Sequence, residues 1–105
     1  MYAFHYRKAK SLTDATDTLG KDEEAKPLSG GMTLIPTLKQ RLAQPTQLVD
    51  IAGLAELAGI DNKNGVLTIG AATRHADVAA SKVVQDAIPA LACLAAGIGD
   101  PQVRN

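Results

Sequence analysis

The chain lacks the residues on which several kinds of site depend. It has no tryptophan and one cysteine, Cys93, so it forms no internal disulfide, and one thiol cannot hold an iron–sulfur cluster, which normally takes about four thiolates. His5 and His75 are the only histidines, and no carboxylate or cysteine surrounds them at metal-ligand spacing. A metal site is therefore not expected. Cys93 itself lies in the apolar run "ALACLAAG" and is predicted to be buried.

An excess of one charge and a long hydrophobic run are also missing. The 11 basic and 11 acidic residues give zero net charge, and the scattered basic residues argue against a nucleic-acid partner. The longest apolar stretch, residues 87–99, is shorter than the roughly 18 residues of a membrane span and contains Pro89. The start, "MYAFHYRKAK", has no apolar signal core. We therefore expect a cytoplasmic protein with no membrane span.

What remains is one small domain, or part of one, with a largely aliphatic core. Aromatic residues make up 3% of the 105 residues, while hydrophobic residues make up 46%. In residues 1–53, strand and helix patterns alternate, which predicts a small parallel βαβ-type sheet. The expected elements are a strand at 2–6, a helix at 12–20 that Ser11 caps and Gly20 ends, a strand at 25–28, a helix at 34–42 with Thr33 as N-cap, and a strand at 47–51. The buried stripe of the second helix is predicted to be Leu34, Ile35, Leu38 and Leu42.

Residues 54–105 have a different pattern, so the fold class expected for the whole chain is α+β. Strands at 57–61 and 66–71 flank Asn64-Gly65, a pair that favours a β-hairpin turn. Short helices are expected at 74–81, 82–86 and 89–96, the first capped by Thr73. The tail, residues 97–105, is expected to be a polar loop.

The stretch "KPLSGGMTLIPTLKQRL", residues 26–42, places Gly30-Gly31 between a strand end and a helix start. Glycines allow a turn in which successive N–H groups converge on an anion, and the following helix adds further unpaired N–H groups. A diphosphate could therefore bind at residues 29–34, although local chemistry alone favours a plain tight turn. Neither G-x-x-x-x-G-K-[ST] nor G-x-G-x-x-G is present. No catalytic constellation is visible, and "TRH" at 73–75 fits either a site or a helix cap.

Three segments in this order, "PLSGGMTLIPTLKQRLAQPTQLVDI", "LTIGAATRHADV" and "GDPQVRN", carry a family resemblance. The chain resembles the FAD-binding medium subunit of molybdenum-containing hydroxylases of the carbon monoxide dehydrogenase and xanthine dehydrogenase type. The resemblance implies the N-terminal part of a PCMH-type FAD-binding domain, with residues 1–53 as its first subdomain and 54–105 as the start of a truncated second one. It also implies that the FAD diphosphate lies against Pro27, Leu28, Ser29, Gly30, Gly31, Met32, Thr33 and Leu34, with Thr73 beside the flavin.

The function implied by the resemblance is electron transfer. FAD would relay electrons from iron–sulfur clusters of a small subunit, which serve a molybdenum-cofactor large subunit, to NAD, a quinone or oxygen. In the family a second glycine pair, Thr-Ile-Gly-Gly, follows the equivalent of Asn105, so the chain is expected to be an N-terminal fragment that binds FAD weakly or not at all and is inactive alone. Two alternatives remain: a non-catalytic interaction fragment without flavin, and a nucleotide or phosphate-sugar binder that uses the same turn.

Overall fold

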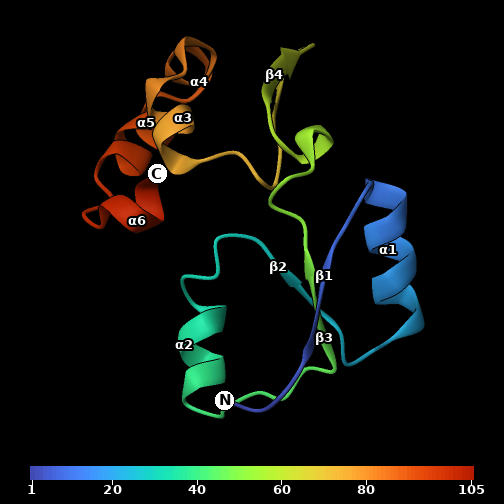
Figure 1. Cartoon of the computed structure of the whole chain (residues 1–105). Coiled ribbons are helices and arrows are strands. Elements are labelled where there is room, and N and C mark those ends of the chain that lie inside the picture. The colour runs from blue at the N-terminus through green and yellow to red at the C-terminus, as the bar shows by residue number, and fades with distance from the viewer. The chain divides into compact units, whose positions relative to one another are not determined.

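The computed structural model describes all residues, 1–105, as two compact units, Met1–Leu54 (unit 1) and Ala55–Asn105 (unit 2) (Figure 1). Unit 1 contains a parallel sheet with helices, and unit 2 contains an antiparallel hairpin followed by short helices. The predicted α+β class, with a parallel part followed by a hairpin and helices, is confirmed. No helix is long and apolar enough to cross a membrane.

Unit 1 is built around a central strand that is paired on both sides. Its elements are β1 (His5–Lys8), α1 (Leu12–Lys21), β2 (Lys26–Leu28), α2 (Leu34–Lys39) and β3 (Gln47–Asp50). All three strands run parallel in the order β1-β3-β2, with His5 opposite Gln47 and Lys26 opposite Leu48. Consecutive residues Leu48 and Val49 are both buried, so both faces of β3 are covered, as in parallel sheets generally. The β2-α2-β3 segment is the predicted crossover unit.

Helix α1 begins as the sequence predicts and ends slightly later. The Ser11 hydroxyl accepts the N–H of Asp14 at 3.0 Å, the usual N-cap bond. Ala15 is buried, but the helix continues through Gly20 to Lys21 because nothing in the sequence after Gly20 forces a turn there. The first strand is likewise displaced and starts at His5, after the Tyr2–Phe4 alternation that suggested it.

Helix α2 is shorter than predicted and ends in a left-handed turn. Arg41 has φ 57°, and the N–H of Leu42 donates to the Thr37 carbonyl while the N–H of Arg41 donates to the Leu38 carbonyl. These two bonds form a Schellman closure, in which the left-handed residue is usually glycine. Leu38 is buried as predicted. Leu42, by contrast, is 77% exposed, because the closure turns the chain before its side chain can reach the core.

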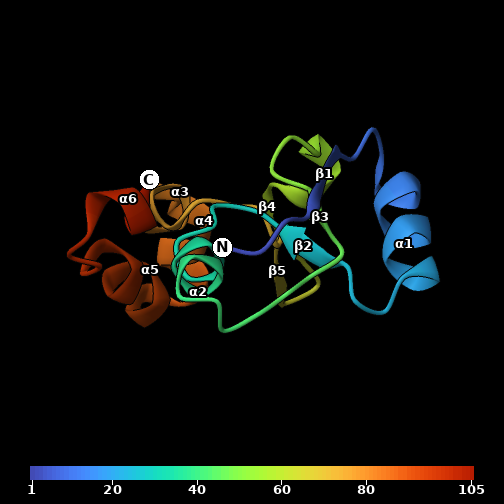
Figure 2. The ribbon, with the colours of Figure 1, turned by 60° about the horizontal axis from the view of Figure 1, so that its bottom comes forward.

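Unit 2 contains the hairpin β4 (Ile60–Lys63) and β5 (Val66–Ile69), with Ile60 opposite Ile69. Asn64 and Gly65 both have positive φ, so the predicted Asn-Gly turn is confirmed. A 3₁₀ turn, η1 (Ala55–Leu57), precedes the hairpin, and the helices that follow are α3 (His75–Ala80), α4 (Lys82–Ala87), α5 (Pro89–Ala96) and α6 (Pro101–Arg104). Helices α3, α4 and α5 pack together (Figure 2) around a core of small aliphatic side chains: Val78, Val84, Ala92 and Ala95, with Ile60, Leu67 and Ile69 against it.

Two predictions for the C-terminal region are wrong. Cys93 is exposed instead of buried. Helix α5 is apolar on nearly every side, so its sequence does not show which face turns inward, and Ala92 and Ala95 occupy the core. The tail is not entirely a loop, because Asp100 accepts the N–H of Gln102 and caps α6, which starts at a proline.

Candidate functional site

The segment after β2 is the turn that the sequence analysis selected. Because β1, β2 and β3 are parallel, their carboxyl ends share one edge of the sheet, the edge at which ligands of open α/β sheets usually bind. The turn, residues 29–33, leaves the sheet at this edge and enters α2. No acidic side chain occurs from Pro27 to Leu34, so nothing in the segment repels an anion.

The two glycines of this turn have different structural roles. Gly31 has φ 75°, a left-handed conformation that costs other residues about 1–2 kcal/mol. A Cβ at Gly31 would lie 2.8 Å from Ile35 Cγ1 and 3.3 Å from Leu28 Cδ1, so the turn is packed against two half-buried side chains. A Cβ at Gly30 would meet no atom within 4 Å. Gly31 therefore shapes the turn, whereas Gly30 keeps a space open beside it.

The main-chain N–H groups of this turn have no partners within the protein. None of the six N–H groups of residues 29–34 donates to a backbone or side-chain acceptor. The next N–H, that of Ile35, donates to the Gly31 carbonyl at 2.9 Å. Thr33 occupies the N-cap position predicted for it, but its side chain makes no cap bond. A row of free donors with an adjacent free hydroxyl is a suitable environment for a phosphate group.

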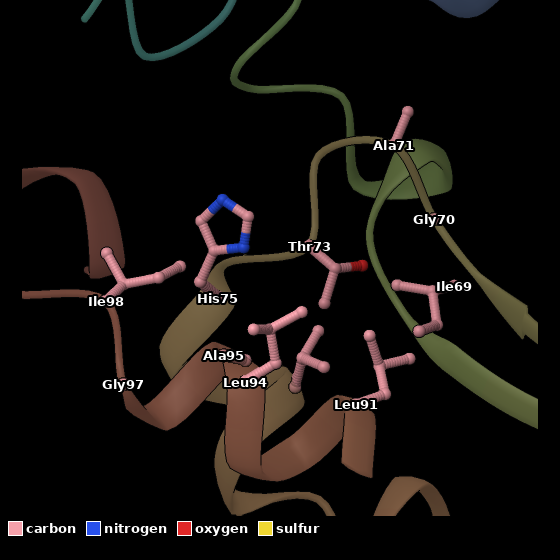
Figure 3. A pocket seen from close by; sticks show the side chains of 11 residues that line it. Ile69, Gly70, Ala71, Thr73, His75, Leu91, Leu94, Ala95, Gly97 and Ile98 are labelled. Atoms are coloured by element: carbon pink, nitrogen blue, oxygen red, sulfur yellow. The ribbon is translucent and has the colours of Figure 1, made fainter. Parts of the chain in front are cut away.

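A second candidate site lies in unit 2, where a cavity of about 530 Å³ opens between the end of β5, α3 and α5 (Figure 3). Its walls are mainly aliphatic, and Thr73 and His75 supply its polar side chains. The aliphatic lining is formed by Ile69, Val78, Leu91, Leu94 and Ile98. The size and lining are typical of pockets for the apolar part of a small ligand.

Thr73 does not cap α3 as predicted, because that helix begins at His75 with Arg74 before it. The Thr73 hydroxyl instead accepts the N–H of Gly59 at 2.9 Å and donates to the Gly59 carbonyl at 3.1 Å. Its side chain therefore ties the start of α3 back to the segment that enters β4. The predicted site residues 27–34 belong to unit 1 and Thr73 belongs to unit 2.

A polar cluster in unit 1 that the sequence does not reveal lines a cavity of about 350 Å³ beside α1 and β3. The N–H of Lys10 and the guanidinium of Arg7, 2.6 Å away, hold the pKa of Asp14 below its usual value. The Thr46 hydroxyl and the Gln47 amide lower the pKa of Asp22 in the same way. These bonds join positions up to 25 residues apart, so no local pattern reveals them. Protein groups already occupy both carboxylates, which indicates a role in holding the loops together.

Comparison with known proteins identifies the class to which this arrangement belongs. Residues 2–105 match the FAD binding domain in molybdopterin dehydrogenase. The chain therefore belongs to this family of FAD-binding domains. The carbon monoxide dehydrogenase medium chain of Hydrogenophaga pseudoflava is 44% identical over 97% of the chain and 36% of that relative. The xanthine dehydrogenase FAD-binding subunit of Escherichia coli O157:H7 is 37% identical over 95% of the chain and 35% of its own length.

Solved structures give the same result. The carbon monoxide dehydrogenase from Hydrogenophaga pseudoflava that lacks the Mo-pyranopterin moiety of its cofactor matches with a TM-score of 0.91 and 43% identity, over 99% of this chain and 37% of that one. Quinoline 2-oxidoreductase from Pseudomonas putida 86 matches with a TM-score of 0.91 and 34% identity, over 99% of this chain and 36% of that one. The chain thus spans about 36% of the length of the relatives it matches.

Proposed function

We propose that this chain is the FAD-binding part of the flavoprotein subunit of a molybdenum-containing dehydrogenase. The observation that carries the proposal is the row of unpaired N–H groups at residues 29–34, in a turn whose open side is kept clear by Gly30. The residues assigned to the cofactor are Pro27, Leu28, Ser29, Gly30, Gly31, Met32, Thr33 and Leu34 in unit 1 and Thr73 in unit 2. The family to which the chain belongs supports FAD as the ligand.

The residues of the turn hold the diphosphate mainly through the main chain. Each hydrogen bond from an N–H group to a charged oxygen contributes roughly 1.5–3 kcal/mol. Two or three such bonds suffice for a weak complex, and further donors from the rest of a complete subunit would strengthen it. FAD, when bound, supplies two-electron redox chemistry, and the protein sets its orientation and exposure to solvent.

In the complete subunit, we propose that the flavin relays electrons from iron–sulfur clusters of a small subunit to NAD, a quinone or oxygen. A large subunit would carry the molybdenum cofactor on which the substrate reacts, and the assembly would be cytoplasmic. The relatives that the sequence matches include a medium chain and a subunit of a dehydrogenase complex, which supports partner subunits for the complete protein. The 105-residue chain alone is expected to bind FAD weakly and to have no dehydrogenase activity.

The direct test is an NMR titration of the isotope-labelled chain with FAD, because amide shifts report weak binding residue by residue. The amides of residues 29–34 should shift with FAD and with inorganic diphosphate, but not with riboflavin, which has no phosphate. Gly30→Ala should weaken the FAD response at least tenfold, because its methyl group would occupy the space beside the donors. Gly20→Ala is the matched control, since Gly20 lies on α1 and its Cβ would also meet no atom within 4 Å. Equal responses to FAD and riboflavin at this turn would refute the diphosphate assignment.

One observation favours a second function, that of an interaction fragment without flavin. Leu94 on the apolar helix α5 is 72% exposed, and Ile88 and Val83 of the same unit are also exposed, and exposed apolar side chains are typical of surfaces that pack against protein. The two functions differ in one measurable property. The natural full-length protein, purified without added cofactor, shows flavin absorbance if the first proposal is correct and shows none if the chain serves only as an interaction fragment.

A further inference from the structure

The segment around Thr73 is paired with the backbone that precedes β4. Beyond the ends of β4 and β5, the N–H of Gly70 donates to the Gly59 carbonyl at 2.8 Å, and the N–H of Ala72 donates to the Leu57 carbonyl at 2.8 Å. The pairing of the two chain segments thus continues past the regular strands, up to the edge of the unit 2 cavity. Gly70 and Ala71 line that cavity, so its rim is formed by the paired backbone.

Close approach of the two backbones makes this pairing sensitive to substitution. A Cβ at Gly70 would lie 2.3 Å from the Leu57 carbonyl oxygen, a separation that no side chain can tolerate without displacing the backbone. Gly59 has φ 136°, in the region that favours glycine. The segment that enters β4 and the segment that leaves β5 therefore each depend on a glycine, and a side-chain contact joins the two segments at Gly59.

Thr73 provides that contact, and its hydroxyl group is fully committed as a donor. A threonine hydroxyl has one hydrogen atom to donate, and here it is directed to the Gly59 carbonyl, while the oxygen accepts the Gly59 N–H. A phosphate oxygen is an acceptor only, so Thr73 could bond to it only by giving up the Gly59 carbonyl. In Figure 3 the Thr73 oxygen points away from His75, and the rest of the side chain lies above Leu91 and Leu94.

We propose that Thr73 is a positioning residue for the flavin site, which acts through Gly59 and the segment 70–72 without bonding to the cofactor. This inference rests on the proposed function. In this proposal, the hydrogen bonds between the Thr73 hydroxyl and Gly59 keep the rim of the unit 2 cavity in the conformation that binds the ligand. Thr73 lines the cavity, and its hydroxyl is bonded to the Gly59 backbone beside the cavity rim.

The test compares Thr73→Val, which keeps the shape of the side chain but removes the hydroxyl, with Thr73→Ser, which keeps the hydroxyl. Thr68→Val is the matched control, because Thr68 is exposed on β5 of the same hairpin. Two quantities are measured on each 105-residue chain: the hydrogen exchange rate of the Gly59 amide without ligand, and the FAD concentration that half-saturates the amide shifts. Hydrogen exchange needs no cofactor, so it tests the contact independently of FAD binding.

The expected result is that Thr73→Val speeds exchange at Gly59 about fivefold to tenfold, the ratio that one ordinary hydrogen bond supplies, and weakens FAD binding by a similar factor. Thr73→Ser and Thr68→Val should leave both quantities within about twofold of the unsubstituted chain. Weaker FAD binding with unchanged Gly59 exchange would show direct contact with the cofactor and would overturn the proposal. Faster exchange with unchanged FAD binding would also overturn it, since the contact would then serve stability alone. No FAD response in the unsubstituted chain would overturn both the proposed function and the positioning role.

Discussion

Replacing Gly30 and Gly31 by alanine, one at a time, tests which glycine is needed for the stability of the turn and which is needed for FAD binding. Gly31→Ala places a methyl group 2.8 Å from Ile35 Cγ1 in a backbone with φ 75°. Gly30→Ala adds the same methyl group one residue earlier, where φ is not positive and no atom lies within 4 Å. Each variant adds one methyl group, and the two differ in the backbone conformation and in what surrounds the added carbon.

The loss of unfolding free energy in Gly31→Ala can be estimated from these contacts. The left-handed backbone costs alanine about 1–2 kcal/mol. Moving Ile35 away from the new methyl group costs about 0.5–1.5 kcal/mol if its side chain leaves a staggered rotamer. Alanine also reduces the conformational entropy of the unfolded chain, which stabilises the folded state by about 0.4–1 kcal/mol. The net destabilisation is therefore about 0.5–3 kcal/mol. Gly30→Ala lacks the first two costs and keeps only the effect on the unfolded chain, so it is expected to stabilise the chain by about 0.4–1 kcal/mol.

The natural fluorophores of the chain make the measurement specific to unit 1. Tyr2 and Tyr6 are its only tyrosines and tryptophan is absent, so tyrosine emission during urea unfolding reports unit 1. We expect a lower urea midpoint for Gly31→Ala, and a slightly higher midpoint with weaker FAD binding for Gly30→Ala. Equal urea midpoints for the two variants would refute the idea that Gly31 alone shapes the turn. Destabilisation by Gly30→Ala would show that the space beside it is not free.

Three further predictions concern the polar cluster of unit 1, the core of unit 2 and the exposed thiol. Hydrogen bonds from a threonine hydroxyl and a glutamine amide lower the pKa of Asp22 in the folded chain. Ionised Asp22 therefore contributes its full stabilisation above the pKa of an unfolded aspartate, about pH 4. This stabilisation is lost as the pH falls through the lower pKa of Asp22 in the folded chain. The urea midpoint of the unsubstituted chain should therefore decrease as the pH is lowered below about 4. Asp22→Asn should reduce that decrease, and an equal decrease in the two chains would contradict this role of Asp22. Val84→Ala should destabilise unit 2 by about 2 kcal/mol because Val84 is fully buried, whereas the neighbouring Val83→Ala should cost less than about 0.5 kcal/mol, as measured by amide exchange in α4. Cys93 should react with a thiol reagent at the rate of an exposed thiol under native conditions, and a rate that rises only with urea would refute its exposure.

Much of the fold could be predicted from local signals in the sequence. Ser11, Asn64-Gly65 and Pro89 mark their elements correctly because caps, hairpin turns and helix starts depend on a few neighbouring residues. The parallel sheet follows from the alternation of strands and helices. The end of α2 could not be predicted, because its closure uses a left-handed Arg41 where a glycine would be the usual signal.

The candidate site could be predicted only in part, because its features differ in how locally they are encoded. Gly30-Gly31 is visible in the sequence, and its neighbours decide that only Gly31 adopts positive φ. The Thr73 contact joins residues 14 positions apart and depends on the pairing of two segments, so the sequence suggested a helix cap instead. The apolar helical run around Cys93 predicts a buried thiol, but such a run does not show which face of the helix is buried.

A site formed by main-chain N–H groups depends on side chains that do not contact the ligand, because those side chains hold the backbone in place. Ser29 and Met32 are exposed in the turn, and their side chains do not determine where the N–H groups point. The direction of those groups depends on the contact of Gly31 with Leu28 and Ile35, which is a matter of packing. Relatives that are 37–44% identical can therefore share the turn while differing along its surface. It follows that Ile35→Ala, which removes the packing behind Gly31, should disturb the amide shifts of residues 29–34 more than Met32→Ala does, although Met32 lies within the turn and Ile35 outside it. The reverse order would mean that side chains of the turn, and not its packed backbone, define the site.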